Sequence, residues 1–473
     1  MLFNSIEYLF FLPIVFLIYW AIGYARINDS LKLRLQNAFV VIASYVFYGW
    51  WDWRFLILIA FTSFCSWSSG LLIDKSRETR VKRSKFWLWL NIAINIGILA
   101  IFKYYDFFVS EFGQMFGMNT GSLLLRVILP VGISFYTFQA LSYSIDVYRG
   151  NIKPTKDIIA FFAFISFFPQ LVAGPIERAT NLLPQFLQNR KFSYEQGVAG
   201  MRQILWGMFK KIVIADNCAT YVDQVWSSYS TQSGSTLLLA AVLFTFQIYG
   251  DFSGYSDIAI GTAKLFGIKL MRNFNNPYFS RDIAEFWRRW HISLTSWFRD
   301  YVYIPLGGSR NGQWKTIANT FVVFMLCAIW HGANWTYMVW GIYNIVLFFP
   351  LILIERKREA KPLELDSLRT AFKMLLTFVL VTIGWIIFRA PTVADAWGYI
   401  SATCTAGWCT LYMTDYTLWV AIAMIGVMLG FEWHYRNTDS VPLPCNILVS
   451  YILIGLIWWF ASHHTTDFIY FQF

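Results

Sequence analysis

Long apolar segments recur along the whole chain and are separated by short polar stretches. A helix of about 17–25 mostly apolar residues is long enough to cross a bilayer. Segments of this kind predict membrane-spanning helices at 5–24, 35–50, 53–73, 86–103, 125–147, 157–173, 237–261, 315–332, 335–354, 370–388, 416–433 and 446–461. Long polar linkers and internal repeats are absent from the sequence. The pattern therefore predicts an all-α, polytopic membrane protein with a single domain over residues 1–473.

One segment, 281–300, has an amphipathic rather than a uniformly apolar pattern. Apolar side chains recur there at every fourth position, at Phe286, Trp290, Leu294 and Phe298. Glu285, Arg289, Ser296 and Arg299 fall on another face. This spacing predicts one amphipathic helix that lies at the membrane interface or against a polar cavity.

A second segment, 247–257, places polar side chains inside an otherwise apolar stretch. An unsatisfied polar group at membrane depth costs several kcal/mol, so these side chains must face protein or water. We predict a polar cavity, with Gln247, Asp251 and Ser253 as candidates to line a substrate passage. The alternative role is hydrogen bonding between helices.

Composition supports the membrane assignment. Apolar residues make up 57% of the chain and charged residues 14%, where soluble domains carry about 25% charged residues. The formal net charge is +11, but the basic residues occur in short runs between apolar segments. Such runs are typical of cytoplasmic loops that face anionic lipid, so nucleic-acid binding is not expected.

The same basic runs predict the orientation of the chain. Lys and Arg collect around 26–34, 75–85 and 356–361, whereas 104–124 and 390–415 carry almost none. The positive-inside rule then places the N-terminus, the two poor loops and His331 on the outer side.

The orientation of residues 174–236 stays ambiguous by the same criterion. Arg202, Lys210 and Lys211 interrupt an apolar run there. This pattern predicts a partly inserted or interfacial helix.

Among the five histidines, His331 and His291 are the candidates for chemistry. His331 ends an apolar segment and is followed by the helix breaker Gly332. An apolar setting favours a neutral imidazole, which a general base for a hydroxyl requires. The alternative for each histidine is a packed ring whose nitrogen bonds the backbone.

Other enzyme signatures are missing from the sequence. No HExxH, CxxC, GxSxG, P-loop or GxGxxG occurs, so no metal and no bound cofactor are expected. Cys404 and Cys409 share one loop and could pair if it faces an oxidising compartment.

Seven motifs, in order along the chain, resemble the membrane-bound O-acyltransferase family, and more closely its bacterial branch that O-acetylates alginate. They are MLFNSIEYLFFLPIVF at the start, PVGISFYTFQALSYSIDVYRG at 130–150, FFPQLVAGPIER at 167–178, QIYGDFSGYSDIAIG at 247–261, FWRRWHISLTSWFRDYVYIPLGG at 286–308, WHGANW at 330–335 and the terminal FIYFQF. The resemblance implies a ring of about 11–12 transmembrane helices around a thinned centre with a catalytic tunnel. It carries the family's defining histidine onto His331 and its second polar position onto His291.

The resemblance also implies substrates, partners and location. We expect the chain in a bacterial inner membrane, in contact with lipid, where it moves an acetyl group from a cytoplasmic thioester such as acetyl-CoA toward an exported polysaccharide. A periplasmic or cell-surface esterase-like transferase of the SGNH type is the expected partner. His331 would be the base and His291 would position or polarise a substrate, and Asn334 joins the tunnel candidates.

Two further readings stay open. Arg288 and Arg289 are candidates to bind donor phosphates, with contact to lipid headgroups as the simpler alternative. Within the family, D-alanyl transfer to teichoic acid or acylation of a lipid is an alternative to acetylation. Outside it, a transporter or channel is the rival, although transporters tend to show internal repeats, which this sequence lacks.

Overall fold

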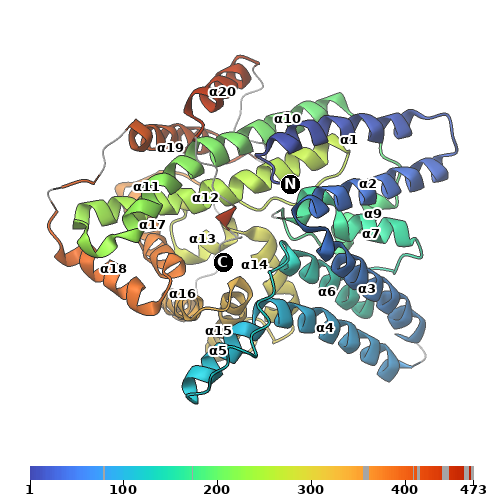
Figure 1. Cartoon of the computed structure of the whole chain (residues 1–473), viewed down its shortest axis with the longest axis horizontal. Helices are drawn as coiled ribbons and strands as arrows, with labels where there is room; N and C mark the ends of the chain where they lie inside the picture. The colour runs from blue at the N-terminus through green and yellow to red at the C-terminus, as the bar shows by residue number, and fades with distance from the viewer. Residues whose placement is uncertain are drawn as a thin grey trace. The chain divides into compact units, whose positions relative to one another are not determined.

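A computed structural model describes residues 1–77, 80–172, 174–354, 362–408, 410–412, 416–438, 447–462 and 468–469. Within these residues every regular element is helical, as predicted (Figure 1). They form two compact units, one of residues 1–204 and 258–271 and the other of residues 205–257 and 272–473. The single domain stays a prediction. Cys409, His463, His464 and the basic run 356–361 lie outside the described residues, so the predictions that involve them are not addressed.

The first unit begins with long helices and continues with shorter ones. They are α1 (Ile6–Tyr24), α2 (Asp29–Asp52), α3 (Leu56–Arg77), α4 (Val81–Lys103), α5 (Tyr105–Met115), α6 (Ile133–Arg149), α7 (Ile158–Ser166), α8 (Phe168–Leu171), α9 (Ala179–Phe186) and most of α10 (Tyr194–Met208). Helices α3, α4 and α6 pack against one another (Figure 1). Buried amides and hydroxyls join them: Asn91 donates to Ser144 at 2.7 Å and accepts from Ser66 at 3.2 Å. Such contacts hold helices together where lipid supplies no hydrophobic driving force.

The second unit contains a π-helical turn (Phe209–Ala215) and α11 (Asp216–Ser227), residues 234–257 of α12 (Gly234–Leu265), α13 (Ile283–Arg289), α14 (Ile292–Phe298), α15 (Gln313–His331), α16 (Trp335–Leu353), α17 (Leu368–Arg389), α18 (Val393–Thr405), α19 (Tyr416–His434) and α20 (Ile447–Phe460). Helices α15, α16 and α17 pack in sequence, each against the next.

Seven helical segments in the described residues are long and apolar enough to span a membrane. They are Ile6–Tyr24, Asp29–Arg77, Val81–Lys103, Gly234–Leu265, Trp335–Leu353, Leu368–Arg389 and Tyr416–His434. The segment Asp29–Arg77 contains both α2 and α3, and the extended backbone of Asp52 separates them. The chain is therefore a multi-pass membrane protein, as predicted.

Two predicted spans are wrong in detail. Residues 125–132 are not helical, and α6 begins only after Gly132. Gly132 has a left-handed backbone (φ 74°). A side chain at Gly132 would collide with the carbonyl oxygen of Leu171. The carboxylate of Asp106 instead accepts hydrogen bonds from the backbone N–H groups of Leu125 and Arg126, which lie in the non-helical segment.

The predicted span 157–173 is also wrong, since it breaks into the short helices α7 and α8. Asp157 caps α7, and the chain turns at Phe167, just before Phe168 and Pro169. Most of these side chains are buried in protein. The apolar run reflects burial within the fold, which sequence alone does not distinguish from a lipid-facing span.

The segment that was expected to form a partly inserted or interfacial helix places Lys210 and Lys211 inside the protein. Both side chains are buried, with 3% and 0% of their surface exposed. Their π-helical turn packs closely on α12. A Cβ at Gly250 would lie 2.9 Å from the backbone oxygen of Lys210, and a Cβ at Gly254 would lie 3.1 Å from the backbone nitrogen of Lys211. The two glycines let both ammonium groups reach carboxylates on α12.

Candidate functional site

The segment around His291 is two helices, not the single amphipathic helix that its spacing predicts. Helix α13 ends where the Trp290 N–H donates to Phe286 O at 2.8 Å. Trp290 then has an extended backbone, and His291 has a left-handed one (φ 45°, ψ 52°) before α14 begins. A left-handed backbone is uncommon for a residue with a side chain, and such conformations concentrate at functional sites. The break at Trp290 and His291 therefore separates α13 from α14.

Asn273 holds the His291 ring by a directional hydrogen bond. His291 Nδ1 lies 3.1 Å from Asn273 Oδ1. The Ser293 backbone N–H and hydroxyl also donate to that atom, at 3.3 and 2.9 Å. A backbone N–H can only donate, so the Asn273 atom must be the amide oxygen, and it must accept from His291 Nδ1–H. A neutral His291 then keeps its lone pair on Nε2.

Burial sets the charge of His291. The side chain is 1% exposed, and its burial lowers the pKa of the imidazole. The amide of Asn273 bonds the ring without adding a negative charge that would favour the imidazolium. The ring is therefore neutral at physiological pH.

His331 closes α15 and is packed among aromatic rings. The helix ends there as predicted, and Gly332 continues in an extended conformation. A side chain at Gly332 would collide with the Tyr337 ring, so the close approach requires a glycine. The imidazole centroid lies 5.3 Å from that of Trp340 and 5.0 Å from that of Phe388. His331 is 7% exposed.

Trp330 joins the two histidines. Its ring centroid lies 6.0 Å from that of His291 and 5.0 Å from that of His331. The residues come from segments that are 40 positions apart, yet one indole contacts both imidazoles. Sequence analysis named both histidines without evidence that they meet, and the structure brings them to one place.

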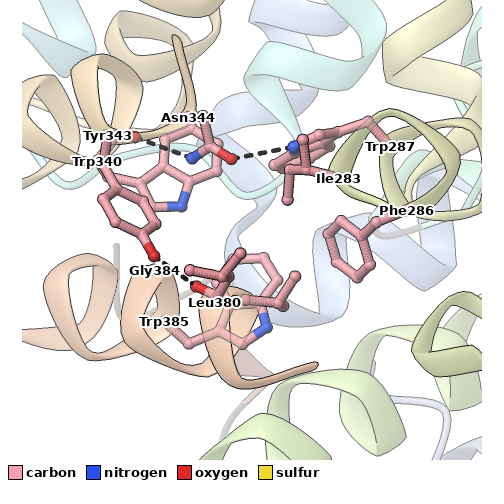
Figure 2. Close-up of a pocket in the computed structure, with 10 residues that line it drawn as sticks. Ile283, Phe286, Trp287, Trp340, Tyr343, Asn344, Leu380, Gly384 and Trp385 are labelled. Atoms are coloured by element: carbon pink, nitrogen blue, oxygen red, sulfur yellow. Dashed lines mark hydrogen bonds between the residues drawn. The ribbon is translucent and has the colours of Figure 1, made fainter. Parts of the chain in front are cut away.

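A small pocket adjoins this site and has room for about one water-sized molecule. Figure 2 shows Trp287 donating to Asn344 Oδ1 at 3.0 Å and Tyr343 donating to Leu380 O at 2.8 Å. Trp340 lines the pocket and also contacts His331. The pocket therefore belongs to the same aromatic surroundings as the histidine pair.

The candidate passage residues are buried, and two of the three bond to lysines. Ser253 accepts from Lys210 Nζ at 2.8 Å, and Asp251 lies 2.7 Å from Lys211 Nζ. Gln247 is 5% exposed, and its Oε1 makes no hydrogen bond to the described residues. Contacts with lysines thus explain why Asp251 and Ser253 can be buried, whereas the burial of Gln247 Oε1 is not explained by a hydrogen bond to the described residues.

Asn334, Arg288 and Arg289 are the remaining predicted site residues. Asn334 caps α16 by accepting from the Thr336 N–H at 3.0 Å, and it donates to Pro391 O at 2.9 Å. Arg288 is exposed. Arg289 pairs with Glu285 at 2.9 Å, so a phosphate would have to compete with that carboxylate.

Sequence reasoning missed Asn273 and the role of the two lysines. Asn273 lies in a non-helical stretch between α12 and α13, where no periodicity or motif marks it. For Lys210 and Lys211 the signal was present, since α12 carries Asp251 and Asp257 inside an apolar helix. No group of three or more metal-ligating side chains was found where the chain is described.

Comparison with known proteins adds an independent line of evidence. The sequence model of the membrane-bound O-acyltransferase family matches residues 153–389, which include both histidines. A probable alginate O-acetylase of Pseudomonas aeruginosa is 40% identical over 86% of this chain and 75% of its own length. A peptidoglycan O-acetyltransferase of Helicobacter pylori is 34% identical over 84% and 78%. A teichoic acid D-alanyltransferase of Bacillus subtilis is 29% identical over 56% and 69%.

Proposed function

Because the chain belongs to the membrane-bound O-acyltransferase family, we propose that it moves an acetyl group from a cytoplasmic thioester to the O-acetylation of an exported polysaccharide. The chain is an O-acyltransferase by that membership. Acetyl is the favoured group because the relatives named for O-acetylation are 34–40% identical to it, whereas a D-alanyltransferase is 29% identical over a shorter stretch.

The histidine pair is the observation that carries the chemistry. His331 and His291 contact one indole, are nearly buried, and are the two histidines that the motifs mark. An acyl transfer to a hydroxyl needs a base for the hydroxyl proton and a group that orients the hydroxyl. Two imidazoles beside one ring supply both.

In the proposed reaction His331 takes the proton of the acceptor hydroxyl as its oxygen attacks the thioester carbonyl carbon. The carbon–sulfur bond then breaks, the new ester bond remains, and the proton passes from His331 to the leaving thiolate. His291, with its lone pair on Nε2, accepts a hydrogen bond from a hydroxyl rather than donating to a carbonyl. The tautomer supports positioning of the acceptor over polarisation of the thioester.

A charged thioester donor cannot cross about 30 Å of hydrocarbon, so the proposal needs a passage to His331 from the cytoplasmic side. Gln247 is the best-supported lining residue, because its buried Oε1 bonds to none of the described residues. Arg288, which is exposed, is the better of the two arginines for a donor phosphate. An SGNH-type transferase on the outer side would receive the acetyl group or deliver it to the polysaccharide.

The decisive experiment measures acyl transfer in inverted membrane vesicles that contain the protein. Labelled acetyl-CoA and a labelled D-alanyl carrier thioester are offered separately, and transfer to a hydroxyl acceptor is followed. We expect transfer from acetyl-CoA that His331→Ala abolishes. Transfer from the D-alanyl thioester alone would replace the proposed group, and wild-type rates in His331→Ala would remove its role as base.

Orientation is tested separately with single cysteines on the intact cell. A cysteine at Lys82 should be protected from an impermeant thiol reagent, and one at Asp395 should react. The reverse pattern would overturn both the outside N-terminus and the outward position of His331.

A further inference from the structure

Lys211 contacts two carboxylates. Its Nζ lies 2.8 Å from Asp216 Oδ1 and 2.7 Å from Asp251 Oδ1, and its side chain has no exposed surface. A buried ammonium requires a counter-charge, because an unpaired ion costs several kcal/mol away from water. Either carboxylate alone would balance it. Charge balance therefore does not explain why both aspartates are buried beside this lysine.

Asp251 has a second contact that suggests what it does. Its Oδ2 accepts a hydrogen bond of 2.6 Å from the backbone N–H of Ile469, which is 218 positions away near the C-terminal end. A hydrogen bond to a charged acceptor is about twice as strong as a neutral one. The carboxylate thus joins α12 to a distant segment of backbone, while Lys211 compensates its charge from the other oxygen.

The anchored segment packs against the wall of the histidine site. Phe468 lies with its ring centroid 4.2 Å from that of Tyr255 and 6.0 Å from that of Phe252, both on α12. Phe252 meets the His291 ring edge to face, with centroids 4.6 Å apart. A continuous series of contacts therefore leads from the Asp251 carboxylate through Phe468 and Phe252 to the imidazole.

We propose that Asp251 is a positioning residue for the acyl transfer. It holds residues 468–469 through the Ile469 N–H, so that Phe468 supports Phe252 behind His291. The inference rests on the proposed function of His291. Asn273 fixes the ring from one side by a hydrogen bond, and Phe252 limits its movement from another by contact. Loss of the hydrogen bond between Asp251 and Ile469 removes no catalytic side chain, but it lets the His291 ring move out of its productive position.

Asp216→Ala is the matched control for Asp251→Ala. Each variant removes one carboxylate from Lys211 and leaves the other in place. Asp216→Ala retains the contact between Asp251 and Ile469, whereas Asp251→Ala removes it. A displacement of about 1 Å at a catalytic group can cost a hundredfold in rate. We expect Asp251→Ala to lower kcat about 10- to 100-fold with little change in the KM for acetyl-CoA, and Asp216→Ala to stay within about threefold of wild type.

Hydrogen exchange measured on the same purified proteins tests the anchor without reference to activity. The peptide that contains Phe468 and Ile469 should lose protection in Asp251→Ala and keep it in Asp216→Ala. Equal loss of protection in both variants, unchanged protection in Asp251→Ala, or equal losses of kcat would overturn the proposal. If wild-type protein transferred no acetyl group, the proposed function would fail, and the exchange data would still decide whether Asp251 anchors the segment.

Discussion

The two histidine regions are built differently, although they share Trp330. His291 sits at a break between two short helices, with a left-handed backbone and a hydrogen bond to Asn273 that selects one tautomer. His331 sits at the end of a long helix among the rings of Trp340 and Phe388. The hydrogen bond at Nδ1 leaves Nε2 of His291 as an acceptor, which is compatible with the positioning role proposed for it. Variants at and around each histidine test the proposed division of roles, in which His331 transfers the proton.

The largest effect should follow from removing the base. His331→Ala should lower acyl transfer about 10²- to 10⁴-fold, the usual contribution of a general base. Membrane insertion and folding should persist, since His331 is the last residue of α15 and its truncation leaves the helix itself unchanged. Detergent-solubilised protein that elutes as wild type on size exclusion is the control for folding. Near-normal turnover in folded His331→Ala protein would remove the proposed role of His331 as the base.

The next effect separates the tautomer from the presence of the ring. Asn273→Ala should lower turnover about 10- to 100-fold, because His291 then loses the bond that fixes its proton on Nδ1. Asn273→Asp keeps an acceptor but adds a negative charge, which raises the pKa of His291 above its wild-type value.

The sign of the pH effect follows from that shift. Protonated His291 has no lone pair on Nε2, so the activity of Asn273→Asp should fall as the pH decreases through the raised pKa. Wild type, in which burial lowers the pKa, should show no such loss from this residue in the same range. Rates of both proteins between pH 5 and 8 would show this, and identical profiles would contradict the proposed contact.

A smaller effect is expected at the turn after His331. Gly332→Ala places a methyl group against Tyr337, whose ring must move. Overpacking of this kind costs about 1–3 kcal/mol, so we expect a lower melting temperature together with a several-fold loss of rate. Unchanged stability would mean that the Tyr337 ring has room to move.

The smallest effect should come from Asn334, which caps α16 beside the base. Asn334→Ala removes the hydrogen bond to the Thr336 N–H and should cost about 1 kcal/mol of stability. Asn334→Asp retains the cap and should restore stability in a thermal unfolding measurement. A rate loss as large as that of Asn273→Ala would instead give Asn334 a direct role in the passage.

The hydropathy pattern predicted most of the long helices but failed at two apolar segments. Most of the long apolar helices were predicted to within a few residues, because the bilayer sets the length of an apolar span. The same signal failed for 125–147, where the helix begins only after Gly132, and for 157–173, where most of the apolar side chains are buried within protein. Hydropathy reports that a segment avoids water and does not report what covers it.

The site was predictable in its groups and not in its geometry. Motifs identified His331 and His291, but strict four-residue spacing suggested one helix where His291 breaks the chain in two. Asn273 comes from a loop without periodicity, and its role depends on a contact over 18 positions. The buried lysines were misplaced because their charges were considered without the aspartates of α12 that compensate them.

That pairing of charges has a consequence for the order in which the protein is made. Lys210 comes before α12 in the chain, so the ribosome delivers its ammonium group before its partner Asp257 exists, whereas Lys211 is followed after five residues by Asp216. On insertion scales each lysine at the centre of a helix costs about 2.5–3.5 kcal/mol. We therefore expect the segment with Lys210 to take its buried place only after α12 has been synthesised, and Gly250 and Gly254 leave the room that its close packing on α12 needs.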